Sequence, residues 1–143
     1  MISKFIHASE GLIFLFCHDK NIRLQFLLGT ICIIIGFLLK ISNTEWLIVL
    51  TFIALVISLE IVNSCIERMC DFIQADYNIE IKHIKDGSAA AVLVVSIFSL
   101  IAALIIFLPK IIHYVLPYLS SIYFSWEEVY PSTSDLLPDF VYR

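Results

Sequence analysis

A stripe of polar side chains within an apolar segment is the first feature of this sequence that could carry out chemistry. Its four members recur at helical spacing: Glu60, Asn63, Glu67 and Asp71. At about 100° per residue, these positions share one helix face roughly 80° wide. Three acids on one face repel one another unless a cation or a basic partner balances their charge. The stripe therefore indicates an acidic functional site.

Carboxylates arranged in this way suit the transfer of a phosphoryl group. Mg²⁺ takes oxygen ligands and usually retains waters and substrate phosphates. A further carboxylate could remove a proton from a hydroxyl group, and a lysine such as Lys85 could balance phosphate charge. The sequence contains no GxxxxGK[ST] loop and no HRD or DFG kinase motif. Any kinase activity would therefore reside in an unrelated kind of site.

A structural role remains open for each of these residues taken alone. Asn63 could form a hydrogen bond between helices, and Asp71 and Asp86 could be solvated charges. However, Lys85 and Asp19 are expected to return to the same membrane interface as the stripe. Several polar residues at one interface favour a functional site over a structural one.

Composition places the chain among integral membrane proteins. Of 143 residues, 60% are hydrophobic and 15% charged, whereas about a quarter are charged in a typical soluble domain. The mean hydropathy is +0.94. The formal charge of −4 and the lack of a run of Lys or Arg argue against a nucleic-acid partner. Four cysteines without CxxC spacing argue against a disulfide scaffold.

Uncharged windows predict three membrane-spanning helices, at about residues 21–40, 46–66 and 87–109. Each is close to the ~20 residues needed to cross a bilayer core of about 30 Å. The second window reaches that length only if it includes Glu60. An acid inside a span costs about 2.5–3.5 kcal/mol, so its presence points to a function.

The segments outside the three spans are also interpretable. Residues 1–20 carry apolar side chains at three- and four-residue spacing, which predicts an amphipathic helix on the membrane surface. Residues 40–45 form a polar turn between two helices. We expect residues 1–110 to form one membrane domain and residues 111–143 an aromatic-rich tail of unknown role.

The basic residues predict the orientation of the chain in the membrane. Six lie before the first span or between the second and third: Lys4, Lys20, Arg23, Arg68, Lys82 and Lys85. Three lie on the opposite side: Lys40, Lys110 and Arg143. The excess of positive charge places the N-terminus and the 67–86 segment in the cytoplasm. Glu60 would then lie near the cytoplasmic interface.

Two motifs in this chain resemble a known family. Residues 60–71 read EIVNSCIERMCD and residues 85–92 read KDGSAAAV. They resemble E-x-x-N-[ST]-x-[IL]-E-x3-D and K-D-x-[AG]-[AS]-x-A-V of the bacterial integral-membrane diacylglycerol kinases and undecaprenol kinases. Upstream, Phe5-x2-Ala8-x2-Gly11-Leu12 and Asp19-x-Asn21-x-Arg23 also fit that family. The resemblance covers about residues 4–108, and Ser88 departs from it where Ala or Gly is usual.

The resemblance implies an all-α membrane protein of the bacterial inner (cytoplasmic) membrane. Three transmembrane helices and an N-terminal amphipathic surface helix would form each subunit of a homotrimer, with sites at the subunit interfaces. Glu60 would be the general base, and Glu67 and Asp19 would ligate Mg²⁺. Asp19 stands where the family usually has Glu. The residues that would surround ATP are Asp19, Asn63, Glu67, Asp71, Lys85 and Asp86.

The implied activity is ATP- and Mg²⁺-dependent phosphorylation of a membrane lipid alcohol. The substrate would be diacylglycerol or undecaprenol, and Asn21 and Arg23 lean towards undecaprenol. A catalytically inactive family member with a structural or interaction role is the alternative, although Glu60 and Glu67 are both present. A small transporter is disfavoured, because the spans lack a midplane acid and a broken helix.

Overall fold

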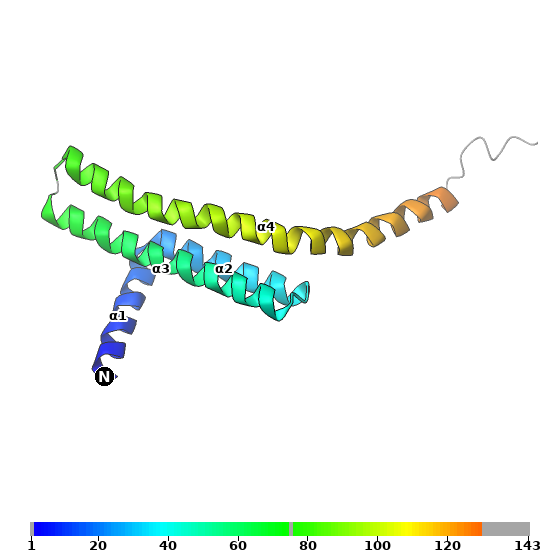
Figure 1. Cartoon of the computed structure of the whole chain (residues 1–143), viewed down its shortest axis with the longest axis horizontal. Helices are drawn as coiled ribbons and strands as arrows, with labels where there is room; N and C mark the ends of the chain where they lie inside the picture. Colours follow the sequence, from blue (N-terminus) through cyan, green and yellow to red (C-terminus); the bar gives the residue numbers. More distant parts are fainter. Residues whose placement is uncertain (1, 75, 130–143) are drawn as a thin grey trace, which may run out of the picture. The chain divides into compact units, whose positions relative to one another are not determined.

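Four α-helices make up the part of the chain that the computed structural model describes, residues 2–74 and 76–129. They are α1 (Ile2–His18), α2 (Lys20–Leu38), α3 (Asn43–Ile73) and α4 (Ile79–Val129) (Figure 1). Three of them, α2, α3 and the Ile79–Tyr114 part of α4, are long and apolar enough to cross a membrane. The predicted all-helical chain with three such helices is confirmed. The surface position of α1 and the homotrimer stay predictions.

The break between α1 and α2 is formed by two polar side chains. Asp19 has an extended backbone, and its Oδ1 accepts hydrogen bonds from the backbone N–H groups of Asn21 (2.8 Å) and Ile22 (3.4 Å). Arg23 caps the C-terminal end of α1, because its Nη1 donates to the carbonyl oxygens of Cys17 (2.8 Å) and Phe16 (3.3 Å). Side-chain caps of this kind replace the hydrogen bonds that helix ends lack. They fix Asp19 at the junction of the two helices.

The turn between α2 and α3 is equally specific. Lys40 has a φ of 50°, and Ser42 begins α3 through a capping box with Glu45. Gly36 lets the turn close, since a Cβ at this position would lie 2.9 Å from the ring of Trp46. The polar turn predicted for residues 40–45 is therefore present, with its last residues forming the first turn of α3.

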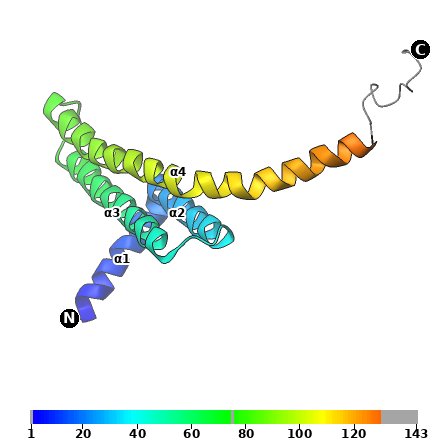
Figure 2. The same cartoon turned by 45° about the vertical axis from the view of Figure 1, so that its right-hand side comes forward.

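The chain divides into two compact units, Met1–Phe107 and Leu108–Arg143. In the first unit, α2 packs against α3 and α1 contacts both, as the two views in Figures 1 and 2 show. A buried apolar cluster joins α3, α4 and the turn between α2 and α3: Ile41, Val49, Ile106 and Phe107. The candidate functional site lies within the first unit.

Two helices are longer than the predicted spans. α3 continues to Ile73 and α4 begins at Ile79, so most of the polar 67–86 segment is helical rather than a loop. Asn78 starts α4, because its Oδ1 accepts from the backbone N–H groups of Glu80 (2.9 Å) and Ile81 (3.4 Å).

The third predicted span ends at residue 109, whereas α4 runs on to Val129 with Pro109 and Pro117 inside it. A proline removes one backbone donor and leaves the carbonyl oxygen four residues earlier without it, but the rest of the helix keeps its backbone hydrogen bonds. Residues 130–143 of the predicted tail lie outside the described residues.

Candidate functional site

The buried polar side chains of the described residues lie in little more than one turn of α3. Glu60 and Asn63 are each 5% exposed and Ser64 is 2% exposed. Burying polar or charged groups costs free energy unless they are paired, so such a cluster needs partners. Among the described residues, every buried side-chain nitrogen and oxygen has a hydrogen-bond partner. Partners come from the other helices and, for the amide nitrogen of Asn63, from α3 itself.

The first partner is Asp19, at the junction of α1 and α2. Ser64 Oγ donates a hydrogen bond of 2.6 Å to Asp19 Oδ2, while Asp19 Oδ1 caps α2. Burial raises the pKa of the Asp19 carboxyl, but the Ser64 hydroxyl, two backbone N–H groups and the charge of Arg68 outweigh it and lower that pKa overall. Asp19 is therefore ionised at neutral pH and held against α3.

The second partner is Ser88, in α4. Its Oγ donates to Asn63 Oδ1 at 2.6 Å, and Asn63 Nδ2 donates to Glu67 Oε1 at 3.0 Å. This chain of hydrogen bonds links α4 to two members of the stripe on α3. The contact between Asn63 and Glu67 is the i,i+4 neighbour relation expected on one helix face.

A third link lies nearer the ends of the same helices. Lys85 Nζ donates to Asp71 Oδ1 at 2.8 Å, joining the start of α4 to the end of α3. The Asp71 side chain is 66% exposed, so this pair contributes little to stability and remains open to a ligand. Asp86 instead lies 3.9 Å from Lys82, one turn earlier in α4.

Glu60 lies at one end of these links, one turn before Asn63 and Ser64 on α3. The charges of Asp19 and Glu67 and the side chain of Asn21 act on its carboxyl group. The fold thus brings Asp19, from outside the stripe, to the acids of α3. No three His, Cys, Asp or Glu side chains of the described residues form a group that could hold a metal ion by themselves.

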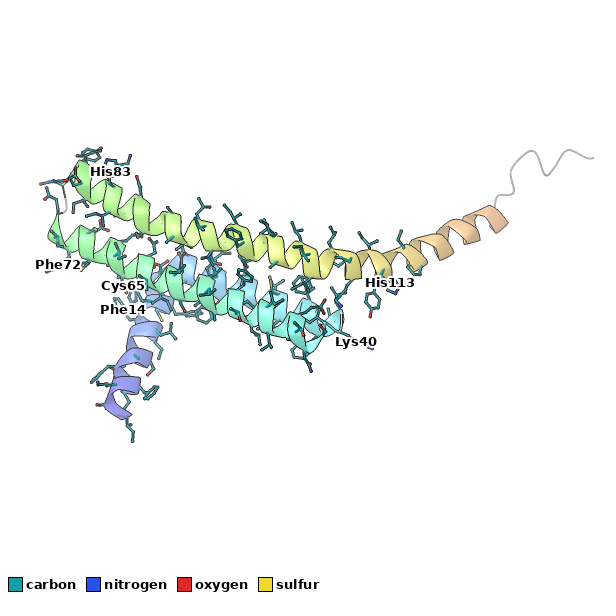
Figure 3. The ribbon with its side chains drawn as sticks, in the orientation of Figure 1. Phe14, Lys40, Cys65, Phe72, His83 and His113 are labelled. Carbon is teal, nitrogen blue, oxygen red and sulfur yellow. The ribbon has the colours of Figure 1, made fainter. Side chains whose placement is uncertain are left out.

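Three residues that contact the site were not predicted to take part in it. Ser64 and Ser88 belong to the two motifs, but a hydroxyl alone does not indicate its partner. Arg68 packs its guanidinium 5.0 Å from the ring centroid of Phe14, which Figure 3 labels on α1. Because Arg68 also acts on Asp19, it couples α1 to the site.

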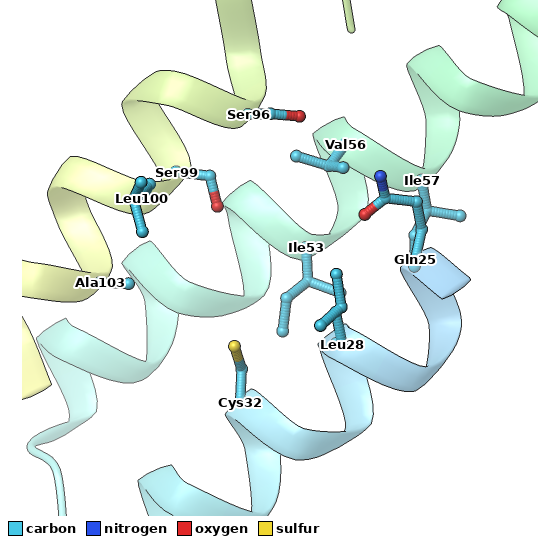
Figure 4. A pocket seen from close by; sticks show the side chains of 11 residues that line it. Gln25, Leu28, Cys32, Ile53, Val56, Ile57, Ser96, Ser99, Leu100 and Ala103 are labelled. Carbon is cyan, nitrogen blue, oxygen red and sulfur yellow. The ribbon is translucent and has the colours of Figure 1, made fainter. Parts of the chain in front are cut away.

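A cavity of about 280 Å³ opens between α2, α3 and α4 (Figure 4). Val56 and Ile57, one turn before Glu60, form part of its wall. The rest of the lining is mainly apolar, with a few polar side chains: Gln25, Ser96 and Ser99. This space could hold a short stretch of hydrocarbon next to the acidic site.

Comparison with known proteins assigns the chain to a family. Residues 6–107 match the family described as prokaryotic diacylglycerol kinase, a range that contains every residue of the acidic site. The chain belongs to this family. It is also 35% identical over 107 residues to the undecaprenol kinase of Bacillus subtilis (strain 168), an alignment covering 75% of this chain and 87% of that protein.

Membership of the prokaryotic diacylglycerol kinase family makes the protein a membrane-embedded lipid kinase, and a kinase family implies ATP as the co-substrate. The predicted kinase activity is thereby confirmed. The prokaryotic diacylglycerol kinase motifs contain Glu60, Asn63, Glu67, Asp71, Lys85 and Asp86. The individual roles of these residues, and that of Asp19, stay predictions.

Proposed function

We propose that this protein transfers the γ-phosphoryl group of ATP to the hydroxyl of undecaprenol in a Mg²⁺-dependent reaction. The observation that carries the proposal is the buried Glu60, which is 5% exposed and whose carboxyl group feels the side chain of Asn21 and the charges of Asp19 and Glu67. The name of the Bacillus subtilis relative supports undecaprenol as the substrate. The family description supports diacylglycerol, with phosphatidic acid as the product, as the second candidate.

Glu60 acts as the general base in this reaction. Its carboxylate takes the proton of the lipid hydroxyl as that oxygen bonds to the γ-phosphorus. The bond between the γ-phosphorus and the bridging oxygen of ATP breaks, and ADP leaves with the electron pair. A base in contact with the attacking hydroxyl contributes about 10²–10⁴ to such a rate.

Asp19 and Glu67 are the residues that would hold Mg²⁺. The ion would offset phosphate charge during the transfer. Two carboxylates suit Mg²⁺, which commonly takes one or two protein carboxylates and completes its shell with waters and substrate phosphates.

The remaining polar residues surround the nucleotide. Lys85 exchanges its Asp71 partner for a phosphate oxygen, which is feasible because the pair is partly exposed. Asn63 and Asp86 complete the nucleotide site from α3 and α4. The predicted set for ATP is thus Asp19, Asn63, Glu67, Asp71, Lys85 and Asp86.

The lipid chain occupies the cavity beside Glu60. Its wall is mostly apolar, and Val56 and Ile57 lie one turn along α3 from the base. A hydroxyl at Glu60 would therefore continue into a hydrocarbon chain on the membrane side. The predicted homotrimer would cover more of the apolar surface that α2, α3 and α4 expose in one subunit.

The proposal predicts phosphorylation that depends on which side of the membrane receives ATP. Sealed inside-out vesicles from cells producing the protein are supplied with undecaprenol, Mg²⁺ and ATP carrying radiolabelled γ-phosphate. If the active site and the N-terminus face the cytoplasm, as the basic residues predict, these vesicles should form labelled undecaprenyl phosphate and right-side-out vesicles should not.

Parallel reactions with diacylglycerol test the second substrate. Labelled phosphatidic acid without undecaprenyl phosphate would replace undecaprenol by diacylglycerol as the acceptor. Label incorporation only in right-side-out vesicles would reverse the orientation. No lipid product in either type of vesicle would contradict the proposed reaction.

Substitutions at Asp19 separate its two tasks, capping α2 and ligating the metal. Asp19→Ala should lose the cap, at a cost of about 1 kcal/mol in the free energy of unfolding, and nearly all activity. Asp19→Asn keeps an oxygen for the backbone donors, so thermal unfolding should stay near that of wild type while activity falls. Asp19→Glu should keep activity within about tenfold, or 1.4 kcal/mol. Full activity in Asp19→Asn would remove Asp19 from the metal site.

A further inference from the structure

Ser88, in α4, forms a hydrogen bond with Asn63, a member of the polar stripe on α3. Its Oγ lies 2.6 Å from Asn63 Oδ1, across the contact between α4 and α3. The same oxygen lies 2.9 Å from the carbonyl oxygen of Lys85, in its own helix. A helical serine can therefore donate within α4 or across to α3, and the shorter distance is the one between the helices.

The side-chain amide of Asn63 has an NH₂ group that donates and an oxygen that accepts, and their two partners determine which way the amide faces. Glu67 Oε1, 3.0 Å from Asn63 Nδ2, belongs to a carboxylate that only accepts, so the NH₂ of Asn63 must face Glu67. Asn63 Oδ1 must then face Ser88, whose hydroxyl has to donate. Because Asn63 is 5% exposed, water has little access to replace that donor.

We propose that Ser88 is a positioning residue that fixes the orientation of the Asn63 amide and thereby the carboxylate of Glu67. Without the hydroxyl, the amide oxygen loses its donor and the amide can rotate away from Glu67. The Glu67 carboxylate then loses a donor that holds it in place. The consequence for catalysis rests on the proposed role of Glu67, whereas the orientation of the amide does not.

The test replaces Ser88 by Ala, Gly and Thr in the full-length protein in detergent micelles. The two side-chain amide proton signals of Asn63 are assigned in ¹⁵N-labelled protein by their loss in Asn63→Asp. Ser88→Ala and Ser88→Gly should shift or broaden these signals, and Ser88→Thr should retain them. Thr51→Val is the matched control, because the Thr51 hydroxyl donates within its own helix to Leu47 (2.7 Å).

Kinetics give a second readout. In Ser88→Ala the KM for ATP at fixed Mg²⁺ should rise about five- to tenfold, the effect of one hydrogen bond, with kcat within about twofold. Ser88→Thr should restore the KM, and Thr51→Val should not change it.

Two results would overturn the proposal. Unchanged Asn63 signals in both Ser88→Ala and Ser88→Gly would show that Ser88 does not orient the amide. A lowered unfolding temperature with wild-type amide signals and an unchanged KM would reduce Ser88 to a link between helices. If the wild-type protein phosphorylates no lipid alcohol, the proposed function fails, but the amide signals still decide this inference.

Discussion

Glu60→Gln is expected to lower kcat by about 10²–10⁴ while leaving the affinity for ATP and Mg²⁺ unchanged. The substitution keeps the size of the buried side chain, which is 5% exposed, but removes the group that takes the hydroxyl proton. Lipid phosphorylation measures turnover, and calorimetric titration of the purified variant with a non-hydrolysable ATP analogue measures binding.

The matched control for Glu60→Gln is Glu10→Gln, the same change at an exposed acid of α1 whose recorded partner is His7. Glu10→Gln should phosphorylate the lipid at the same kcat as the wild-type protein. Full turnover in Glu60→Gln would contradict the assignment of Glu60 as the base. Loss of nucleotide binding in that variant would instead give Glu60 the role proposed for Glu67.

Glu67→Gln is expected to weaken Mg²⁺-dependent nucleotide binding by at least about tenfold, or 1.4 kcal/mol. Glu67 lies seven residues after Glu60, about 10 Å along α3, so the two acids cannot contact the same atom. Glutamine removes the charge that a hard cation requires. It also places an amide where Asn63 Nδ2 now donates to a carboxylate oxygen at 3.0 Å.

Titrations with the ATP analogue in the presence and absence of Mg²⁺ separate the metal from other effects. Wild type and Glu67→Gln should differ in their affinity for the ATP analogue when Mg²⁺ is present and have equal affinities when it is absent. Equal affinities in both conditions would exclude Glu67 as a metal ligand. Weaker binding in both conditions would indicate a direct contact with the nucleotide.

The sequence alone was sufficient for the local features of this protein. Three apolar windows predicted three helices long enough to cross a membrane, because hydropathy and length are properties of each segment by itself. Helical spacing placed Glu60 and Asn63 on one face, and their burial follows from that face packing inward. The motifs also indicated the family that the comparisons establish.

Sequence patterns were less informative about where helices end. The polar residues after the second window suggested that α3 leaves the membrane but not that it stays helical to Ile73. Similarly, Pro109 suggested an end that α4 does not have, since Ile79–Val129 includes it and Pro117. One proline costs a single backbone donor, which a long apolar helix tolerates.

Only the tertiary structure decided which polar groups meet. Ser64 reaches Asp19 across 45 positions of sequence and Ser88 reaches Asn63 across 25. A hydroxyl has one donor and several possible acceptors, so its partner depends on how the helices pack rather than on local spacing. The sequence thus determined the acids of the site, whereas the packing of α2 and α4 against α3 determined which side chains hold those acids in place.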